Sequence, residues 1–491
     1  MFQKVLIANR GEIAVRIIQA CRDLGIISVA VYSEADREAL HAQIADEAVC
    51  IGPARAADSY LNMDNIISAA LASGCQAIHP GFGFLSENPD FAERITQAGL
   101  AFIGPTAATI RLMGDKSEAK RNAIAAGVPV ALGTDGPLRD FDEAISEAER
   151  IGYPVMLKAA SGGGGKGIRV AESVKDLKDA YDSASAEAIA NFGDGRLYME
   201  KYIHNPRHIE VQILGDNYGN VVHLYDRDCS VQRRNQKLVE EAPAPFLPSD
   251  VTDQLETYSR RLFEAVDYEG LGTCEFMVTE QGKVYFLEVN PRLQVEHTVS
   301  EEVCGLDLVR EQLTIANGEE LTVNHPLRGH SFELRLTCED PAKNLAPSSG
   351  TLTSLRWPSG PGIRVDSGVV EGDTISPKFD SMMGKLVVTA SDRAAAVARV
   401  RRALSELKVE GVPTPASLFE QIFNDDEFTA EHGAAYDVST KWLERKYLNK
   451  EAVSSQGGQP ASVSGTTGSL DVDKKESSET FVIEVNNHRV S

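Results

Sequence analysis

The sequence predicts a chain that is α/β at its N-terminal end and α+β over the rest. Three observations lead to this prediction. Strand and helix patterns alternate over about the first hundred residues, the two mix from about 115 to 330, and strand patterns dominate from 331 to about 447. At 491 residues the chain exceeds the size of a single core, so several domains are expected.

The N-terminal region, residues 1–114, is expected to form a doubly wound parallel sheet. Short apolar runs at Lys4–Ala8 and Ile27–Tyr32 flank Glu12–Leu24, in which apolar residues recur at helical spacing, and a third strand is expected at Gln76–His79. In such strand–helix–strand units the helix returns the chain to the same end of the sheet, so the strands lie parallel. The crossover is right-handed, and the helices cover the sheet. The first strand–helix turn lacks the G-x-G-x-x-G spacing, so a dinucleotide fingerprint is absent.

Composition argues against several classes of protein. The formal charge is −23, which disfavours general binding to nucleic acids or anionic membranes. The seven cysteines are scattered without a C-x-x-C pair, which favours reduced thiols in the cytoplasm over a disulfide framework or a zinc site. The N-terminus enters a strand pattern at once without the features of a signal peptide, and no apolar run approaches the length of a membrane span.

The segment Glu288–His297 holds the densest group of polar residues after an apolar strand. Glu288 and Asn290 are hard oxygen donors two residues apart on a strand, so they share a face and can hold Mg²⁺. The planar guanidinium of Arg292 can donate paired hydrogen bonds to a phosphate or a carboxylate, and Glu296 is available as a base. These parts suit phosphoryl transfer to a small anion. The alternative is an exposed, salt-bridged strand end.

A glycine-rich loop, Ser161–Gly167, follows an apolar strand at Tyr153–Leu157. Consecutive glycines let backbone N–H groups approach phosphate oxygens, and Lys158 and Lys166 add positive charge. The spacing is not that of a P-loop. We therefore expect a flap that covers phosphates, the alternative being a plain surface turn.

Three further features leave alternatives open. Met199–Ile203 is either a hinge against which an adenine packs or an ordinary strand end. Gln232–Lys237 is either an anion-binding run or a solvated face. Arg335, between two leucines of a predicted strand, is either exposed or stabilises a developing oxyanion.

Taken in order, these segments resemble the biotin carboxylase family of ATP-grasp enzymes over about residues 2–447. Val365–Asp373 and Tyr436–Trp442 resemble more narrowly the biotin carboxylase portion of acyl-CoA carboxylase α subunits. The segments that define the wider resemblance are Ile7–Ala14, His79–Asn88, Leu112–Lys116, the glycine loop, Met199–Tyr202, Asn205–Glu210, Arg227–Ser230, Glu240–Pro245 and Glu288–His297.

The resemblance implies a division of the chain into parts. The Ser- and Gly-rich stretch after residue 447 agrees with a linker. The parts are a biotin carboxylase N-terminal domain at 1–114, an ATP-grasp domain at 115–330 with a mobile lid at about 131–203, a strand-rich biotin carboxylase C-terminal domain at 331–447, a flexible linker at 448–479 and the start of a truncated further domain at 480–491.

The resemblance also implies ATP, Mg²⁺ or Mn²⁺, bicarbonate and biotin as ligands. The implied residues are Lys116, Lys158, Gly163, Gly164 and Gly165 for the ATP phosphates; Glu200, Lys201 and Ile203 for the adenine; His208, Gln232 and Asn235 near the ribose or phosphates; Glu275, Glu288 and Asn290 for the metal; Lys237, Arg292, Gln294 and the Val295 backbone for bicarbonate; Glu296 as the base; and Arg335 for the enolate of biotin.

The implied reaction is ATP-dependent carboxylation of biotin through carboxyphosphate. Two positions depart from the family pattern. Many members carry His where Asn235 stands, which weakens a contact with the ribose or phosphates, and many carry Tyr where Phe82 stands, which removes a hydroxyl near the site. Neither change removes a group that the chemistry requires.

The partners follow from what the sequence lacks. No Ala/Val-Met-Lys-Met biotin-attachment motif is present, so biotin is expected on a separate carrier protein or on a further C-terminal domain. Residues 480–491 read as a strand, a turn and the start of a return strand, which is either a frayed end or the beginning of that domain. A carboxyltransferase (β) subunit and a homodimer or larger complex are also expected.

Alternative functions remain open at this point. They are the biotin carboxylase subunit of a pyruvate carboxylase, another ATP-grasp carboxylate–amine ligase, and a nucleotide-binding assembly subunit without activity. The acyl-CoA that is finally carboxylated is not encoded in this chain, because that choice belongs to the transferase.

Overall fold

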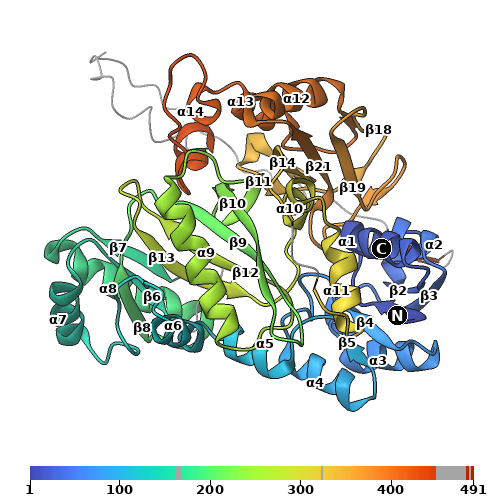
Figure 1. The fold of residues 1–491 in the computed structure, drawn as a ribbon, viewed down its shortest axis with the longest axis horizontal. Coiled ribbons are helices and arrows are strands. Elements are labelled where there is room, and N and C mark those ends of the chain that lie inside the picture. The colour runs from blue at the N-terminus through green and yellow to red at the C-terminus, as the bar shows by residue number, and fades with distance from the viewer. Residues whose placement is uncertain (161–166, 322–324, 449–482, 486–487, 491) are drawn as a thin grey trace. The chain divides into compact units, whose positions relative to one another are not determined.

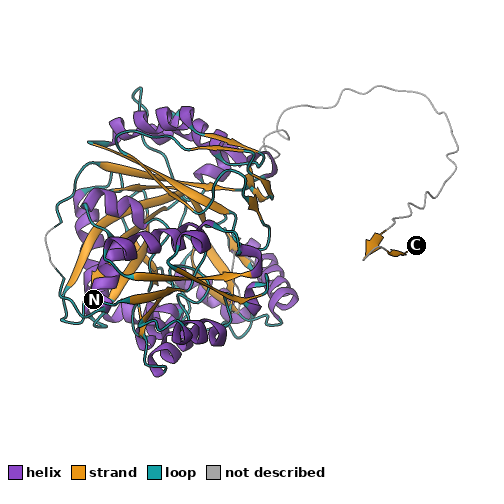
Figure 2. Cartoon of the chain, turned by 90° about the vertical axis from the view of Figure 1, so that its right-hand side faces the viewer, coloured by secondary structure: helices purple, strands orange, loops and turns teal. Residues whose placement is uncertain are grey.

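The computed structural model describes residues 1–160, 167–321, 325–448, 483–485 and 488–490. The chain divides into two compact units, Met1–Leu448 and Asn449–Ser491. The first unit confirms the predicted mixed class, with a parallel sheet at its N-terminal end and antiparallel sheets beyond it (Figure 1). Figure 2 shows strands lying between helices within this unit. None of the described helices has both the length and the apolar content to cross a membrane.

The N-terminal sheet is parallel, as predicted, with the strand order β3-β2-β1-β4-β5. Chain order reverses between β1 and β4, so the turns that follow these two strands open a crevice at that point. The expected first helix is α1 (Gly11–Asp23), whose Ile13 and Ile17 are buried in one core with Val5. The strands are β1 (Lys4–Ile7), β2 (Ile27–Ser33), β3 (Glu47–Gly52), β4 (Ala77–His79) and β5 (Ala101–Phe102).

Helices cover this sheet and connect it to the next part of the chain. Asn62 and Asn88 cap α3 and α4 by accepting a hydrogen bond from the third residue after each, which satisfies a free N–H of the first turn. The helices are α2 (Leu40–Ile44), α3 (Met63–Ala72), α4 (Pro89–Gln97), α5 (Ala107–Gly114) and α6 (Lys116–Ala125).

The region expected to be a lid, 131–203, contains a three-stranded antiparallel sheet in the order β7-β6-β8. It has a core of its own, which includes Leu157, Leu177 and Met199. Gly163, Gly164 and Gly165 lie outside the described residues. The elements are α7 (Phe141–Ile151), β6 (Val155–Ala159), β7 (Ile168–Ala171), α8 (Val174–Phe192) and β8 (Leu197–Lys201).

An eight-stranded antiparallel sheet in the order β13-β12-β9-β10-β11-β14-β21-β19 forms the centre of the unit. It continues through residue 330, so strands on both sides of that position share one hydrogen-bonded sheet. The strands are β9 (Arg207–Gly215), β10 (Val221–Arg233), β11 (Gln236–Ala242), β12 (Gly270–Val278), β13 (Val284–Asn290), β14 (His330–Thr337), β19 (Ile363–Ser367) and β21 (Met382–Ala390).

Helices pack on this sheet, and short strands pair into separate two-stranded sheets in the C-terminal part of the unit. The helix predicted from the apolar spacing after Asp392 is α12, which Asp392 caps. The helices are α9 (Ser249–Glu264), α10 (His297–Cys304), α11 (Leu308–Ala316), α12 (Arg393–Glu406), α13 (Ala416–Phe423) and α14 (Asp426–Thr429), and the short strands are β15 (Glu339–Asp340), β16 (Ala346–Pro347), β17 (Gly350–Thr351), β18 (Ser354–Arg356), β20 (Thr374–Ile375) and β22 (Lys408–Glu410).

The described residues of the second unit are two short strands. β23 (Ile483–Val485) pairs antiparallel with β24 (His488–Val490), as expected for a hairpin. The linker was predicted at 448–479. All of it except residue 448 lies outside the described residues.

Candidate active site

Three carboxylates lie in one row across the central sheet. Glu288 on β13 is opposite Glu275 on β12, which is opposite Glu210 on β9. Side chains directly opposite each other share a face, and like charges at that spacing repel. Glu210 and Glu275 are buried and Glu288 is half-buried, so the row requires cations close to it.

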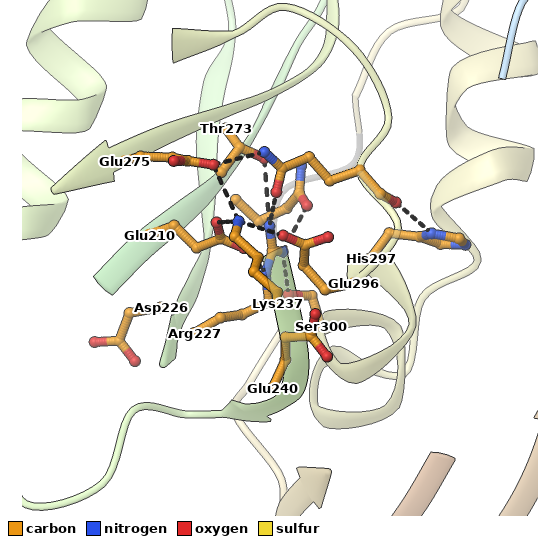
Figure 3. A network of polar contacts seen from close by, with 12 residues as sticks. Glu210, Asp226, Arg227, Lys237, Glu240, Thr273, Glu275, Glu296, His297 and Ser300 are labelled. Carbon is orange, nitrogen blue, oxygen red and sulfur yellow. Dashed lines mark hydrogen bonds and ion pairs between the residues drawn. The ribbon is translucent and has the colours of Figure 1, made fainter. Parts of the chain in front are cut away.

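Lys237 on β11 supplies the central cation (Figure 3). Its Nζ lies 2.5 Å from a Glu210 oxygen, 3.0 Å from Oε1 of Glu275 and 2.5 Å from Oε1 of Glu296. Burial alone would lower the pKa of the Lys237 ammonium, but the three carboxylates raise that pKa well above its ordinary value. Lys237 is therefore a fixed positive charge at the centre of the site.

Arg227 on β10 supplies a second buried cation, whose side chain is fully inaccessible to solvent. Its Nε donates to Oε1 of Glu210 at 2.6 Å, and its Nη1 donates to Ser300 Oγ at 2.8 Å. The same guanidinium reaches Oε1 of Gln294 at 3.5 Å. Arg227 thus connects the row of carboxylates to α10 and to the segment that follows β13 (Figure 3).

The side chain of Arg335 on β14 is only 12% exposed, which excludes the alternative that it simply points to solvent. Its Nη2 donates to Oε2 of Glu296 at 3.0 Å, and its Nε donates to Oε1 of Glu240 at 2.6 Å. Burial would raise the pKa of Glu296, but Lys237 and Arg335 hold that pKa well below its usual range. Glu296 is therefore an ionised carboxylate that two cations hold in place, rather than a free one.

A cavity of about 380 Å³ opens beside these groups. Lys237, Arg292, Val295 and Arg335 line one side of it. The other side comes from the turns after β1 and β4 at the crevice of the N-terminal sheet, which include Phe82. The fold thus brings Lys237, Arg292 and Val295, three of the four residues predicted for bicarbonate, to the lining of one cavity, whereas Gln294 is not part of that lining.

Arg292 and Gln294 are positioned by neighbouring polar groups. Nε of Arg292 donates to Oε2 of Glu87 at 2.8 Å, and its Nη2 donates to Oδ1 of Asn290 at 2.9 Å. Nε2 of Gln294 donates to Oε1 of Glu275 at 3.0 Å. These bonds connect the predicted anion-binding residues directly to the predicted metal ligands.

The predicted metal ligands fit a hard divalent cation. Glu275, Glu288 and Asn290 offer carboxylate and amide oxygens from two adjacent strands, which is the donor set that Mg²⁺ and Mn²⁺ prefer. Nζ of Lys116 lies 3.0 Å from Oε2 of Glu288. Lys116, Glu288 and Asn290 also line a second cavity of about 640 Å³.

The residues predicted for the adenine lie on and after β8. Glu200 forms ion pairs with Lys158 on β6 and with Lys120 on α6, the latter at 3.4 Å. Nζ of Lys201 donates to the carbonyl oxygens of Gly152 at 2.9 Å and Tyr153 at 2.7 Å. The side chain of Lys201 therefore fixes the turn before β6.

The three residues predicted for the ribose or phosphates occupy two kinds of position. His208 Nε2 lies 2.9 Å from Oε2 of Glu275, and Nε2 of Gln232 lies 3.2 Å from Nδ1 of His208, so these two are buried beside the row of carboxylates. Asn235 is exposed in the two-residue turn between β10 and β11, where both Arg234 and Asn235 have positive φ. That conformation favours Asn over most residues.

Comparison with known proteins identifies the family. Residues 1–110 match the family model of the biotin carboxylase N-terminal domain, and residues 333–445 match that of the biotin carboxylase C-terminal domain. Residues 115–324 match the ATP-binding domain of the carbamoyl-phosphate synthase L chain. The chain belongs to the biotin carboxylase family. As a biotin carboxylase it is an ATP-dependent ligase.

Relatives of this biotin carboxylase include proteins that the match spans almost completely and longer ones. It is 50% identical over 430 residues to the biotin carboxylase of Nostoc sp., covering 87% of this chain and 96% of the relative. It is 46% identical over 448 residues to the biotin-dependent acyl-coenzyme A carboxylase alpha3 subunit of Mycobacterium leprae, covering 91% of this chain and 75% of that one.

A solved structure agrees with the fold of this biotin carboxylase. The biotin carboxylase domain dimer of the Hydrogenobacter thermophilus 2-oxoglutarate carboxylase, in complex with MgADP, ADP and bicarbonate, is 46% identical with a TM-score of 0.84. The match covers 91% of this chain and 98% of that chain.

Several polar residues of this biotin carboxylase carried no predicted role. Glu87, Glu210, Arg227 and Glu240 lie within the segments that define the resemblance, yet their spacing alone does not show what they contact. Their partners are up to 205 residues away in the sequence, as for Glu87 and Arg292. For Glu210, Arg227 and Glu240 the sequence offers one signal, which is a charged residue within a predicted strand. Such a residue is rarely buried without a partner of opposite charge.

Proposed function

We propose that this biotin carboxylase carboxylates biotin on a carrier protein or domain, as the ATP-using component of an acyl-CoA carboxylase. The observation that carries the proposal is the cavity lined by Lys237, Arg292 and Arg335, of which Lys237 and Arg335 bind the carboxylate of Glu296. Three cations on one cavity, two of them bound to an ionised carboxylate, suit an anionic substrate that must lose a proton. The relative from Mycobacterium leprae and the Val365–Asp373 segment favour an acyl-CoA carboxylase.

The division into 1–114, 115–330 and 331–447 is part of this proposal, with 131–203 as a lid. What supports the lid is that this region has its own sheet and its own core. A segment with a separate core can move as one body without exposing apolar surface. Closure would keep water from carboxyphosphate, which hydrolyses readily.

For ATP, we assign the phosphates to Lys116, Lys158 and the glycines at 163–165, and the adenine to Glu200, Lys201 and Ile203. The lysines suit phosphate oxygens, and in this structure both are paired with carboxylates that an incoming phosphate would replace. His208, Gln232 and Asn235 are assigned to the ribose or phosphates. The buried bond between His208 and Glu275 keeps the imidazole in one orientation.

Glu275, Glu288 and Asn290 would hold Mg²⁺ or Mn²⁺. A divalent cation bound there supplies positive charge that offsets the charge of the ATP phosphates during transfer. The carboxylate of Glu275 is prepared for this role, since burial would raise its pKa but Lys237 and His208 hold that pKa well below the usual range.

Bicarbonate is assigned to Lys237, Arg292, Gln294 and the backbone of Val295, with Glu296 as the base. A bicarbonate placed among these groups would compete with Glu296 for Lys237 and Arg335. When Lys237 and Arg335 interact less strongly with the Glu296 carboxylate, its pKa rises. Glu296 is then a stronger base at the moment when the proton is transferred.

The proposed reaction first forms carboxyphosphate and then carboxylates biotin. Glu296 accepts the bicarbonate proton, and a carbonate oxygen forms a bond to the γ-phosphorus while the bond to ADP breaks. Carboxyphosphate then separates into CO₂ and phosphate, and the phosphate near Arg292 takes the N1′ proton of biotin. N1′ forms a bond to the carbon of CO₂ while Arg335 stabilises the negative charge of the biotin enolate.

ADP release with Mg-ATP and bicarbonate, with and without free biotin, tests this proposal. Release that requires bicarbonate and rises with biotin is the expected result. Release that ignores both would point instead to another ATP-grasp ligase, and bound ATP without any release would point to an inactive assembly subunit. If free biotin has no effect, a biotinylated carrier domain takes its place in the assay.

The choice of final acceptor needs a second assay. The alternative is a carboxylase of an oxo acid such as pyruvate, and the Hydrogenobacter relative belongs to a 2-oxoglutarate carboxylase. Transfer of labelled carboxyl from carboxybiotin to an acyl-CoA, with a carboxyltransferase (β) subunit added, is expected. Transfer to an oxo acid alone would reject the acyl-CoA assignment.

Sedimentation of the purified chain tests the expected homodimer.

A further inference from the structure

Two cations are neighbours on adjacent strands of the central sheet, and a role has been proposed for only one of them, Arg335. Lys385 on β21 is directly opposite Arg335 on β14. Directly opposite residues place their side chains on one face of a sheet, where like charges repel. The pair persists because each cation has anionic or dipolar partners of its own. Arg335 has Glu240 and Glu296.

The partners of Lys385 lie in two other parts of the chain. Its Nζ donates to the carbonyl oxygen of Val295 at 2.9 Å and lies 3.3 Å from Oε2 of Glu12. Lys385 is fully buried, and Glu12, in the first turn of α1, is 3% exposed. No hydrogen bond to Oε1 of Glu12 comes from any residue that the structure describes. A buried ion pair that is incompletely hydrogen-bonded contributes little to stability, so its retention calls for another reason.

The two opposed cations hold two successive residues of the anion-binding segment. Lys385 binds the carbonyl of Val295, and Arg335 binds the carboxylate of Glu296. The backbone N–H of Val295 donates to no acceptor within the described part of the chain, and Val295 lines the cavity of about 380 Å³. Lys385 thus holds the carbonyl on one side of the Val295 Cα, while the N–H on the other side has no acceptor among the described residues.

Close packing keeps Glu12 beside this lysine. A Cβ added at Gly368, the residue after β19, would lie 2.4 Å from the backbone N of Glu12. The start of α1 is therefore pressed against the edge of the central sheet. Within that contact the Glu12 carboxylate reaches the ammonium of Lys385, and Glu12 itself lines the cavity.

We infer that Lys385, with Glu12 as its counter-ion, is a positioning residue for bicarbonate binding. By holding the Val295 carbonyl it restricts rotation about the Cα of Val295, which positions the N–H of the preceding peptide group for the anion, while Arg335 holds Glu296 beside it. This inference rests on the proposed function, because the anion in the cavity is taken to be bicarbonate. Among the described residues, Lys385 forms no hydrogen bond or ion pair with a residue assigned to the nucleotide or to the metal.

The test compares Lys385→Met with the double variant Lys385→Met/Glu12→Gln. Lys385→Met removes the hydrogen bond to Val295 and also leaves Glu12 buried without its cation, which can destabilise the fold. The double variant removes that unpaired charge yet still lacks the hydrogen bond. Lys408→Met, an exposed lysine of the same region, is the matched control. For each protein, the KM for bicarbonate, the KM for ATP and the thermal midpoint are measured in the ADP-release assay and by circular dichroism.

We expect the double variant to keep the thermal midpoint and the KM for ATP of the wild-type protein, while its KM for bicarbonate rises about tenfold. Equal rises in both KM values, or a KM for bicarbonate that returns to the wild-type value in the double variant, would show a merely structural role and overturn the inference. A wild-type protein without bicarbonate-dependent release would instead reject the proposed function, and this inference with it.

Discussion

Glu275 on β12 and Glu288 on β13 are directly opposite each other, and a different lysine neutralises each of them. Lys237 lies 3.0 Å from Glu275, and Lys116 lies 3.0 Å from Glu288. Neither lysine comes from the two strands that carry the carboxylates. The repulsion between the carboxylates is thus balanced by cations from outside the strand pair.

Replacing one of these carboxylates is expected to affect metal use more than folding. Glu288→Gln keeps the shape of the side chain and removes one charge of the repelling pair, so the thermal midpoint should stay the same or rise. The Mg²⁺ concentration for half-maximal ADP release should rise about tenfold, since one hard anionic ligand is lost. Glu406→Gln, on the surface of α12, is the control. An unchanged Mg²⁺ requirement would remove Glu288 from the metal site.

Loss of the base is expected to stop chemistry while nucleotide binding remains. In Glu296→Gln one oxygen remains to accept a hydrogen bond from either Lys237 or Arg335, which donate to different oxygens of Glu296, and the amide can no longer take a proton. We expect kcat to fall at least about 100-fold with ATP affinity within about threefold of wild type. Isothermal titration with ATP and the ADP-release assay measure the two quantities. Near-normal biotin-dependent turnover in this variant would refute the role of Glu296.

The fold was predictable because its repeating patterns are local. The spacing of Ile13 and Ile17 predicted α1, and the apolar runs predicted β1, β2 and β4. The polar residues at and after the end of β13 were also recognisable as candidates, because they follow the apolar run at 284–287 within one short segment.

The role of buried charges could not be predicted in the same way. Arg335 was compatible with exposure because an Arg between leucines normally points to solvent, yet both faces of β14 are covered in this fold. Alternation then carries no information about which side is buried. The pairing of Arg335 with Lys385 depends on strand register, and that of Glu12 with Lys385 joins residues 373 positions apart (385 − 12).

A cluster away from the cavities should govern stability at low pH. Glu241 on β11 accepts hydrogen bonds from Arg393 and lies 2.8 Å from the imidazole of His330. Burial would raise the pKa of Glu241, but Arg393 and His330 lower it to about 2. A carboxylate whose pKa is lowered on folding stabilises the protein above its unfolded pKa, and this contribution is lost as the pH falls toward the folded value.

We therefore expect Glu241→Gln to lower the free energy of unfolding by about 3 kcal/mol at pH 7. The difference from wild type should be complete above about pH 4.5 and shrink as the pH falls toward 2. Urea denaturation at pH 7, 5 and 4 gives the comparison, with Glu406→Gln as the control. A difference that stays constant from pH 7 to pH 4 would mean that packing, and not the charge of Glu241, sets the effect.

Asn235 combines a conformational role with a proposed contact to ATP, and two substitutions separate them. Arg234 and Asn235 form the two-residue turn between β10 and β11 with φ of +49° and +65°. Glycine adopts this conformation without strain, whereas alanine costs about 1 kcal/mol there. Both substitutions remove the amide. If the amide contacts the nucleotide, Asn235→Gly and Asn235→Ala should both raise the KM for ATP about threefold, the low end of what one lost hydrogen bond costs.

The thermal midpoint should distinguish the two variants even though their kinetics agree. Asn235→Gly is expected to melt with the wild-type protein, and Asn235→Ala a few degrees lower, since only the second strains the turn. A glycine variant with the wild-type KM for ATP would show that Asn235 is present for its backbone conformation alone. In that case the difference from the histidine of many family members would have no consequence for ATP binding, because the side chain at this position would not reach the nucleotide.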